Sequence, residues 1–200
     1  MSLIATFNKN YYFYFMTYEY SDGYKIRNQQ ATHFLTFTIE GWIDIFSRKD
    51  YRNIVLECFK FCQENKQLKI HAYVIMTNHI HVIWTAQNGN ISDIIRDFKS
   101  YTSRMFLQTI NSIPESRKDW LLYMFEFFGN KTNRNKTFKI WTSNNHPEEI
   151  ESEDFFFQKL NYIHQNPVRA GIVLNQDEYI YSSASNYAKK DSVFQIDFLF

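Results

Sequence analysis

Two histidines separated by a single residue, His79 and His81, are the side chains whose spacing in this sequence points most directly to chemistry. In a β-strand, residues i and i+2 point to the same face, so both imidazoles would line one surface while Ile80 points to the other. Two imidazoles on one face can bind a divalent metal ion. The spacing alone is a weak signal, and a purely structural role for the pair is equally consistent with it.

Tyr162 and Asn166 form a second pair, four residues apart in a segment with helical patterning, so the phenol and the carboxamide would project from one helix face. A tyrosine hydroxyl can act as a nucleophile, but a free phenol has a pKa of about 10 and needs a neighbouring cation or base. The Asn166 side-chain oxygen could complete a metal site with the histidines, which would suit Mg²⁺ or Mn²⁺. Without the histidines, a buried tyrosine and a helix-capping asparagine would be the better interpretation.

Tyr101 is an alternative nucleophile, because it also lies in a helical segment after the two histidines. Tyr162 is preferred, since only Tyr162 is followed by an oxygen ligand four residues later. The remaining histidines are interpreted as structural or surface residues, and they are His33, His71, His146 and His164.

The patterning of hydrophobic residues predicts the elements that must position these side chains. β-branched and aromatic residues over 31–39 are typical of a strand, and apolar residues at helical spacing over 51–64 indicate an amphipathic helix. Two β-rich runs follow, over 68–77 and 79–85, and the Thr77–Asn78 pair favours a tight antiparallel hairpin. A strand, a helix and a hairpin in this order make half of a ferredoxin-like pattern.

Three further helices and one further strand are expected, with the helices over 91–110, 117–128 and 153–165 and the strand over 137–142. Gly129 is expected to end the middle helix. The last helix must end near Asn166, because Pro167 disfavours helical dihedral angles in the residue before it, and Gly171 then closes the turn. The basic, asparagine-rich segment over 130–136 is a candidate flexible flap.

The composition is that of one compact domain. Of 200 residues, 5 are Gly, 3 are Pro and 19% are aromatic, whereas a disordered chain has many more breakers and far less aromatic mass. We expect an N-terminal extension over 1–23 outside the fold, a single domain over 24–187 and a C-terminal tail over 188–200. Cys58 and Cys62 are four residues apart in the first helix, which favours reduced thiols and a cytoplasmic protein. No apolar run reaches the roughly 18 residues of a membrane span.

Both chemical motifs resemble those of one family. Residues 77–82, TNHIHV, are similar to the HUH motif (histidine, bulky hydrophobic residue, histidine) of the single-tyrosine, IS200-like transposases. Residues 162–171, YIHQNPVRAG, resemble the signature of the REP-associated tyrosine transposases within that superfamily. The segments FKSYTS over 98–103 and SSA over 182–184 are also similar, so the resemblance runs from about Tyr24 to about Tyr187.

The resemblance implies an α+β fold, a ferredoxin-like palm with an antiparallel sheet and helices packed on one face. It implies one divalent metal ion, Mg²⁺ or Mn²⁺, bound by His79, His81 and Asn166. It also implies that Tyr162 attacks a phosphodiester of single-stranded DNA, leaving a 3′-hydroxyl and a 5′-phosphotyrosine link that conserves the bond for rejoining. The expected activity is therefore cleavage and rejoining of hairpin DNA.

Contact with DNA must come from a local patch, because 22 Lys and Arg against 21 Asp and Glu give no bulk attraction to nucleic acid. In a DNA enzyme such a patch would contact backbone phosphates, and the candidate residues are Arg96, Lys99, Arg104, Lys131, Arg134 and Arg169. The same charges are otherwise typical of a solvated helix face. The expected partner is single-stranded or hairpin DNA, bound by a monomer or a homodimer.

Two other functions remain open. The chain could be a catalytically silent protein that binds hairpin DNA. The presence of the nucleophile and all three metal ligands argues against this, and these residues are Tyr162, His79, His81 and Asn166. It could also be a metal-dependent hydrolase that uses an activated water, although the motifs include no acidic ligand and no nearby Glu base.

Overall fold

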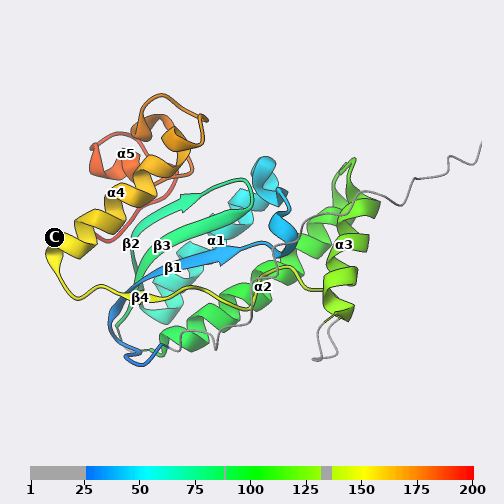
Figure 1. The fold of residues 1–200 in the computed structure, drawn as a ribbon, viewed down its shortest axis with the longest axis horizontal. Helices are drawn as coiled ribbons and strands as arrows, with labels where there is room; N and C mark the ends of the chain where they lie inside the picture. Colours follow the sequence, from blue (N-terminus) through cyan, green and yellow to red (C-terminus); the bar gives the residue numbers. More distant parts are fainter. Residues whose placement is uncertain (1–25, 88, 132–136) are drawn as a thin grey trace, which may run out of the picture.

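The computed structural model describes residues 26–87, 89–131 and 137–200 (Figure 1). The predicted extension over 1–23 and most of the predicted flap, including Arg134, lie outside these described residues. The strands are β1 (Thr32–Thr38), β2 (Leu68–Ile75), β3 (His79–Ala86) and β4 (Glu148–Glu149). The α-helices are α1 (Lys49–Lys66), α2 (Ile91–Ser112), α3 (Lys118–Asn130), α4 (Glu153–Arg169) and α5 (Ala184–Tyr187).

The four strands form one antiparallel sheet in the order β2-β3-β1-β4. With α1 between β1 and β2 and α2 between β3 and β4, this order is that of the ferredoxin-like fold, so the predicted fold class is confirmed (Figure 1). The register places His81 opposite Thr36 and His79 opposite Thr38 in the centre of the sheet.

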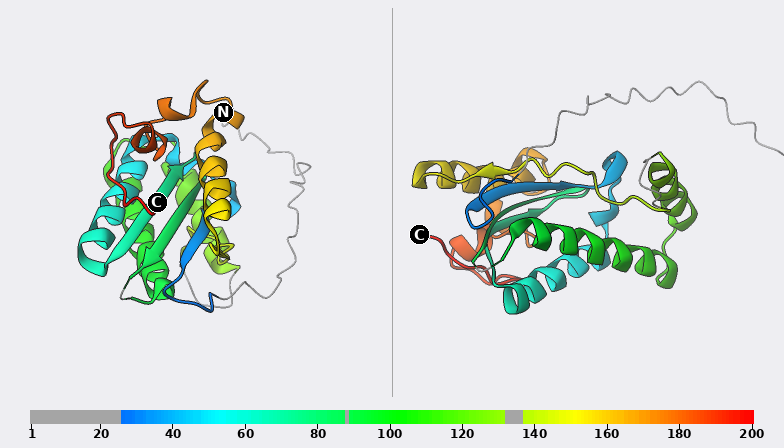
Figure 2. Two further views of the ribbon diagram at one scale, coloured as in Figure 1. Left: turned by 90° about the vertical axis from the view of Figure 1, so that its left-hand side faces the viewer. Right: turned by 90° about the horizontal axis from the view of Figure 1, so that it is seen from below.

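Alternation along the strands gives the sheet two apolar faces, and helices cover both. On one face, Trp84 of β3 lies 5.5 Å from Phe59 of α1 and 5.6 Å from Phe98 of α2 between ring centroids. The other face carries α4 (Figure 2). The buried residues of α4 include Phe156 and Ile163. The predicted packing on one face therefore holds for α1 and α2, and α4 adds a layer on the opposite face.

The fourth strand differs from its prediction. Residues 137–142 form no strand; only Trp141 makes a bridge, to Ile39 of the chain beyond β1, and the paired residues are Glu148–Glu149. Trp141 is buried, and its indole N–H donates to the Thr102 hydroxyl at 3.0 Å. Two backbone hydrogen bonds flank this bridge, from the Glu40 N–H to the Ile140 carbonyl at 2.7 Å and from the Thr142 N–H to the Thr38 carbonyl at 2.9 Å. They are too few for a strand, and the aromatic and β-branched composition of the segment reflects burial against α2.

The four predicted helices also end beyond their predicted positions, by two residues for α1, α2 and α3 and by four residues for α4. Gly129 lies inside α3, which ends at Asn130. α4 continues through Pro167 and ends at Arg169. Pro167 has no N–H to donate to the Ile163 carbonyl four residues back, so α4 continues past it to Arg169 without that hydrogen bond. Gly171 follows with a φ of 69°, a left-handed conformation that suits glycine, and its N–H donates to the Val168 carbonyl at 2.9 Å. The predicted role of Gly171 is confirmed.

The end of the chain covers the outer edge of β2. The backbone N–H of Ser183 donates to the Tyr73 carbonyl at 2.9 Å. That of Asp197 donates to the Ile70 carbonyl at 2.8 Å. Phe194 is buried between these contacts, with its ring centroid 5.5 Å from that of Tyr73. The residues after α4 are therefore part of the packed structure.

Cys58 and Cys62 lie on the buried side of α1 as free thiols, as predicted. Within the described ranges, the structure has no helix that combines the length and apolar character of a membrane span.

Three histidines interpreted as structural or surface residues are buried: His33, His71 and His164. His71 is the most fully bonded, with Nδ1 donating to the Asp197 carbonyl at 2.7 Å and Nε2 lying 2.8 Å from the Thr85 hydroxyl. Burial disfavours the imidazolium form and lowers the pKa of His33 and of His71 below the ordinary 6.5.

We expect mild acid to destabilise the protein. Below a pH of about 6.5 the unfolded chain binds protons at His33 and His71, whereas the folded chain binds them only at lower pH. The free energy of unfolding is therefore highest above that pH and falls as the pH is lowered from 7 to 5. Urea denaturation at the two pH values measures the change. His71→Gln should reduce the difference, and His146→Gln, at an exposed position, should not; an unchanged difference in His71→Gln would contradict the assignment.

Candidate active site

His79 and His81 lie next to each other on the sheet face that carries α4, with ring centroids 4.8 Å apart. His81 is 5% exposed and His79 is half-buried. Burial lowers the pKa of His79 to about 4 and that of His81 to about 3, and the charges of His79 and Lys159 lower the pKa of His81 further. Both rings are therefore neutral near pH 7, the state in which imidazole binds a metal.

Hydrogen bonds hold the two rings through Nδ1. The Asn78 carboxamide oxygen lies 2.8 Å from Nδ1 of His79, and the Thr36 hydroxyl lies 2.9 Å from Nδ1 of His81. A carboxamide oxygen only accepts, so Nδ1 of His79 carries the proton and Nε2 keeps its lone pair. Within the described ranges, neither Nε2 forms a hydrogen bond. One nitrogen oriented by a neighbour and the other left available is the arrangement of metal-binding histidines.

The structure brings Tyr162 to these histidines, although it lies far along the chain on α4. Its ring centroid is 5.2 Å from that of His81, with the rings at 71°. Phe34 of β1 lies against both, stacked on His81 at 5.4 Å and edge-on to Tyr162 at 5.9 Å. Tyr162 remains 38% exposed. The phenol therefore borders the imidazole pair and stays accessible to a substrate.

Asn166 lies one turn after Tyr162 and is half-buried. Its Nδ2 donates to the Tyr162 carbonyl at 3.0 Å, so Oδ1 is the atom left for a ligand. Among the residues that the structure describes, no three His, Cys, Asp or Glu side chains are grouped to hold a metal ion. A metal bound by both histidines would thus need an oxygen from another residue type, as an amide provides.

Lys159 is a functional candidate that the sequence analysis missed. Its side chain is 17% exposed, and Nζ lies 2.6 Å from Oε1 of Glu148 and 4.5 Å from the centroid of the Phe34 ring. It precedes Tyr162 by three residues on α4, and this helical spacing was the signal in the sequence that could have revealed it. Lys159 also lines a hollow of about 210 Å³ with Gln158, Asn161, Tyr162 and Arg169.

Among the described candidates for DNA contact, Arg169 is the residue that lies beside the phenol, with its guanidinium carbon 5.7 Å from the Tyr162 ring centroid. Three others are on α2, across the sheet from Tyr162, and Lys131 follows α3. Arg96 forms ion pairs with Asp93 and Asp97, at 2.6 and 3.1 Å. Lys99 Nζ donates to the Thr142 carbonyl at 2.8 Å, the guanidinium of Arg104 lies over Tyr101 at 5.6 Å, and Lys131 lies over Phe127 at 4.2 Å.

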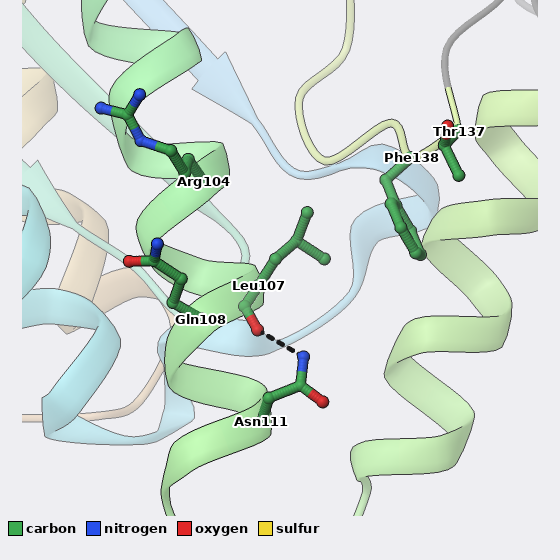
Figure 3. A pocket seen from close by; sticks show the side chains of 6 residues that line it. All are labelled: Arg104, Leu107, Gln108, Asn111, Thr137 and Phe138. Carbon is green, nitrogen blue, oxygen red and sulfur yellow. Dashed lines mark hydrogen bonds between the residues drawn. The ribbon is translucent and has the colours of Figure 1, made fainter.

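Tyr101, the alternative nucleophile, is likewise on α2 and shares the surface of Arg104 rather than that of the histidines. A larger, open hollow of about 660 Å³ lies on the same helix, between α2 and the segment that follows α3 (Figure 3). It is lined by Arg104, Leu107, Gln108, Asn111, Thr137 and Phe138. These side chains include no nucleophile or base beside a metal-binding group, so this hollow is not the candidate for catalysis.

Comparison with known proteins gives one family. Residues 29–143 match the sequence model of the family described as "Transposase IS200 like". No curated protein sequence matches the chain significantly. The solved structure of a REP-associated tyrosine transposase bound to a REP hairpin covers 84% of this chain and 86% of its own, with a TM-score of 0.60 and 16% identity. The crystal structure of a protein from Deinococcus radiodurans R1, described as a transposase, covers 66% of this chain and 87% of its own, with a TM-score of 0.40 and 14% identity.

Proposed function

The chain belongs to the IS200-like transposase family, and from this premise we propose that it cleaves and rejoins single-stranded DNA at hairpins through a covalent bond to Tyr162. The observation that carries the proposal is the position of the Tyr162 ring, 5.2 Å from that of His81, beside two imidazoles with available Nε2 atoms. The family match includes both histidines and ends before α4. The assignment of Tyr162 as the nucleophile therefore depends on its position beside His81 and not on the family match. A protein of the same fold is bound to a REP hairpin, which supports hairpin DNA as the substrate class.

In the proposed reaction, the Tyr162 hydroxyl oxygen attacks the phosphorus of one phosphodiester. A bond from the phenol oxygen to phosphorus forms, and the bond from phosphorus to the 3′-oxygen breaks. The phenol loses one proton and the departing 3′-oxygen gains one, so a 3′-hydroxyl and a 5′-phosphotyrosine result. Attack by a 3′-hydroxyl on the phosphotyrosine reverses these bond changes and rejoins DNA without water or nucleotide energy.

The metal site of the proposal consists of His79, His81 and the Asn166 side-chain oxygen. A bound Mg²⁺ or Mn²⁺ would supply Lewis-acid polarisation of a non-bridging phosphate oxygen. The chain itself fixes the ring orientations through Asn78 and Thr36, and burial keeps both rings neutral.

Lys159 and Arg169 are the cations that border the phenol. Lys159 is held by Glu148 at 2.6 Å and lines the same hollow as Tyr162. Arg169 lines this hollow too, with its guanidinium carbon 5.7 Å from the Tyr162 ring centroid. A phosphate entering there would meet two positive charges on α4, one on either side of Tyr162 in the sequence. We assign both residues to binding the scissile phosphate and stabilising the charge that develops on it.

Lys159→Ala is expected to lower the single-turnover cleavage rate by about 10- to 100-fold, since a largely buried cation is lost beside the reacting phosphate. Lys159→Arg should restore part of the rate, because it retains the charge. Lys60→Ala is the matched control, as Lys60 is an exposed α1 lysine with its own Glu64 partner. Equal rates for Lys159→Ala and Lys60→Ala would contradict the role.

The proposed function is tested with a hairpin oligonucleotide that has a single-stranded extension and a label at its 3′ end, incubated with the protein and Mn²⁺. The 5′-phosphotyrosine bond leaves the labelled fragment attached to the protein, so a denaturing gel should show a retarded DNA band. A silent binding protein would retard DNA only on a native gel. A hydrolase would shorten the DNA without any adduct.

A further inference from the structure

Trp42 is an exposed aromatic residue in the turn after β1, and its ring lies close to that of His79. It is 63% exposed, and its ring centroid is 5.9 Å from that of His79, with the rings at 70°. It ends the short 3₁₀ turn Glu40–Trp42, which follows β1. Tryptophan side chains are largely buried in most proteins. An exposed indole beside a candidate metal ligand is therefore unusual, and exposed aromatic rings are common at binding surfaces.

The backbone at Trp42 is held in an unfavourable conformation. Its φ is 55°, in the left-handed region, which costs a residue with a Cβ roughly 1 kcal/mol or more. The Trp42 N–H donates to the Ile39 carbonyl at 3.0 Å, which closes the turn. Gly41 is packed against α3 so tightly that a Cβ there would lie 2.6 Å from the Phe128 ring. The turn is therefore fixed from both sides, and it presents the indole outward.

A single side chain connects this turn to the candidate metal site. The carboxamide oxygen of Asn78 accepts a hydrogen bond from the Nδ1–H of His79 at 2.8 Å. Through Nδ2 it donates to the Trp42 carbonyl at 3.3 Å and to Asp44 Oδ1 at 2.9 Å. The orientation of His79 and the position of Trp42 are thus set by the same amide group.

We propose that Trp42 is a stacking platform for one unpaired nucleobase next to the phosphate that Tyr162 attacks; this inference rests on the proposed function. Single-stranded DNA offers exposed base faces, and proteins bind them with aromatic side chains beside groups that bind the backbone. In a duplex these faces are covered by neighbouring bases. Trp42 would therefore favour the unpaired strand that adjoins a hairpin over the hairpin stem.

The test measures binding in the Tyr162→Phe background, so that no DNA is cut, at one fixed salt concentration. The probe is a fluorescent hairpin oligonucleotide with a single-stranded extension, and its Kd is measured by anisotropy. Trp42→Gly should raise the Kd by about 5- to 150-fold, the range for loss of one stacked base. Glycine suits the left-handed backbone, so the turn should keep its fold, which thermal unfolding verifies. Trp42→Phe should retain part of the affinity.

A second arm locates the base by replacing each position of the extension with an abasic site. One position should weaken binding by Trp42 protein, and the same replacement should have no further effect in Trp42→Gly. Trp120→Ala is the matched control, because Trp120 is a 48% exposed tryptophan on α3. Unchanged affinity in Trp42→Gly, or additive losses at every abasic position, would overturn the stacking role while leaving DNA binding in place. Failure of every variant to bind the hairpin would instead overturn the proposed function.

Discussion

Tyr162→Phe is expected to abolish the covalent DNA adduct and to lower cleavage at least about a thousandfold, while the Kd for hairpin DNA changes by less than about threefold. The substitution removes the attacking oxygen, and no other group can take its place in a mechanism that passes through a phosphotyrosine. The ring contacts with His81 and Phe34 persist in the variant. Within the described residues the Tyr162 hydroxyl makes no hydrogen bond, so its loss leaves no buried partner unsatisfied.

A denaturing gel of the 3′-labelled oligonucleotide measures the adduct, and anisotropy measures the Kd. Tyr101→Phe is the control, because Tyr101 has the same exposed fraction, 38%, and lies on α2 across the sheet. It should keep full activity. An adduct formed by Tyr162→Phe, or lost in Tyr101→Phe, would show that the nucleophile has been wrongly assigned.

His79→Ala is expected to lower Mn²⁺-dependent cleavage by about 100-fold or more and to weaken Mn²⁺ binding in calorimetry to a similar degree. Removing one of two imidazoles leaves His81 and the Asn166 oxygen as protein ligands, and these two bind the ion much more weakly than three. Thr36→Val tests the supporting hydrogen bond, since it removes the hydroxyl 2.9 Å from Nδ1 of His81 and nearly preserves the volume. Thr36→Val should lower the affinity for Mn²⁺ by about 10- to 100-fold.

His146→Ala is the control for the histidine series, because this imidazole is exposed and lies on the segment before β4. It should leave Mn²⁺ binding and cleavage unchanged. Full cleavage by wild-type protein in excess chelator would end the metal assignment. That result would leave the assignment of Tyr162 open to its own test, since the adduct is measured separately.

The sequence predicted those parts of the fold that depend on local periodicity. The strand of His79 and His81 and the hairpin it forms follow from alternating β-rich runs, and the helix of Tyr162 follows from apolar spacing. The juxtaposition of these two elements could be inferred from the family resemblance, not from spacing. The prediction of a strand over 137–142 was wrong. The segment is irregular and contains the buried Trp141, and its aromatic and β-branched composition is the same as that of a strand.

Other parts of the site depend on contacts between distant segments. Lys159 is an ordinary helix residue until Glu148 and Phe34 enclose it. Trp42 resembles any apolar residue after a strand, and its exposure arises from a left-handed turn that Asn78 and Phe128 hold in place. The extent of α4 could not be predicted from Pro167, because the preference of the preceding residue against helical dihedral angles is a local tendency that the packing of α4 on the sheet overrides.

The covering of β2 by residues near Ser183 and Asp197 has a consequence for solubility. Sheet edges with free N–H and C=O groups recruit strands from other molecules, and the result is polymerisation or amyloid. Here one border of the sheet already pairs with its own chain, and the other ends in a two-residue strand made of adjacent carboxylates, Glu148–Glu149. Neither border offers a long apolar template, so an open sheet rich in aromatic residues is guarded against edge-to-edge aggregation.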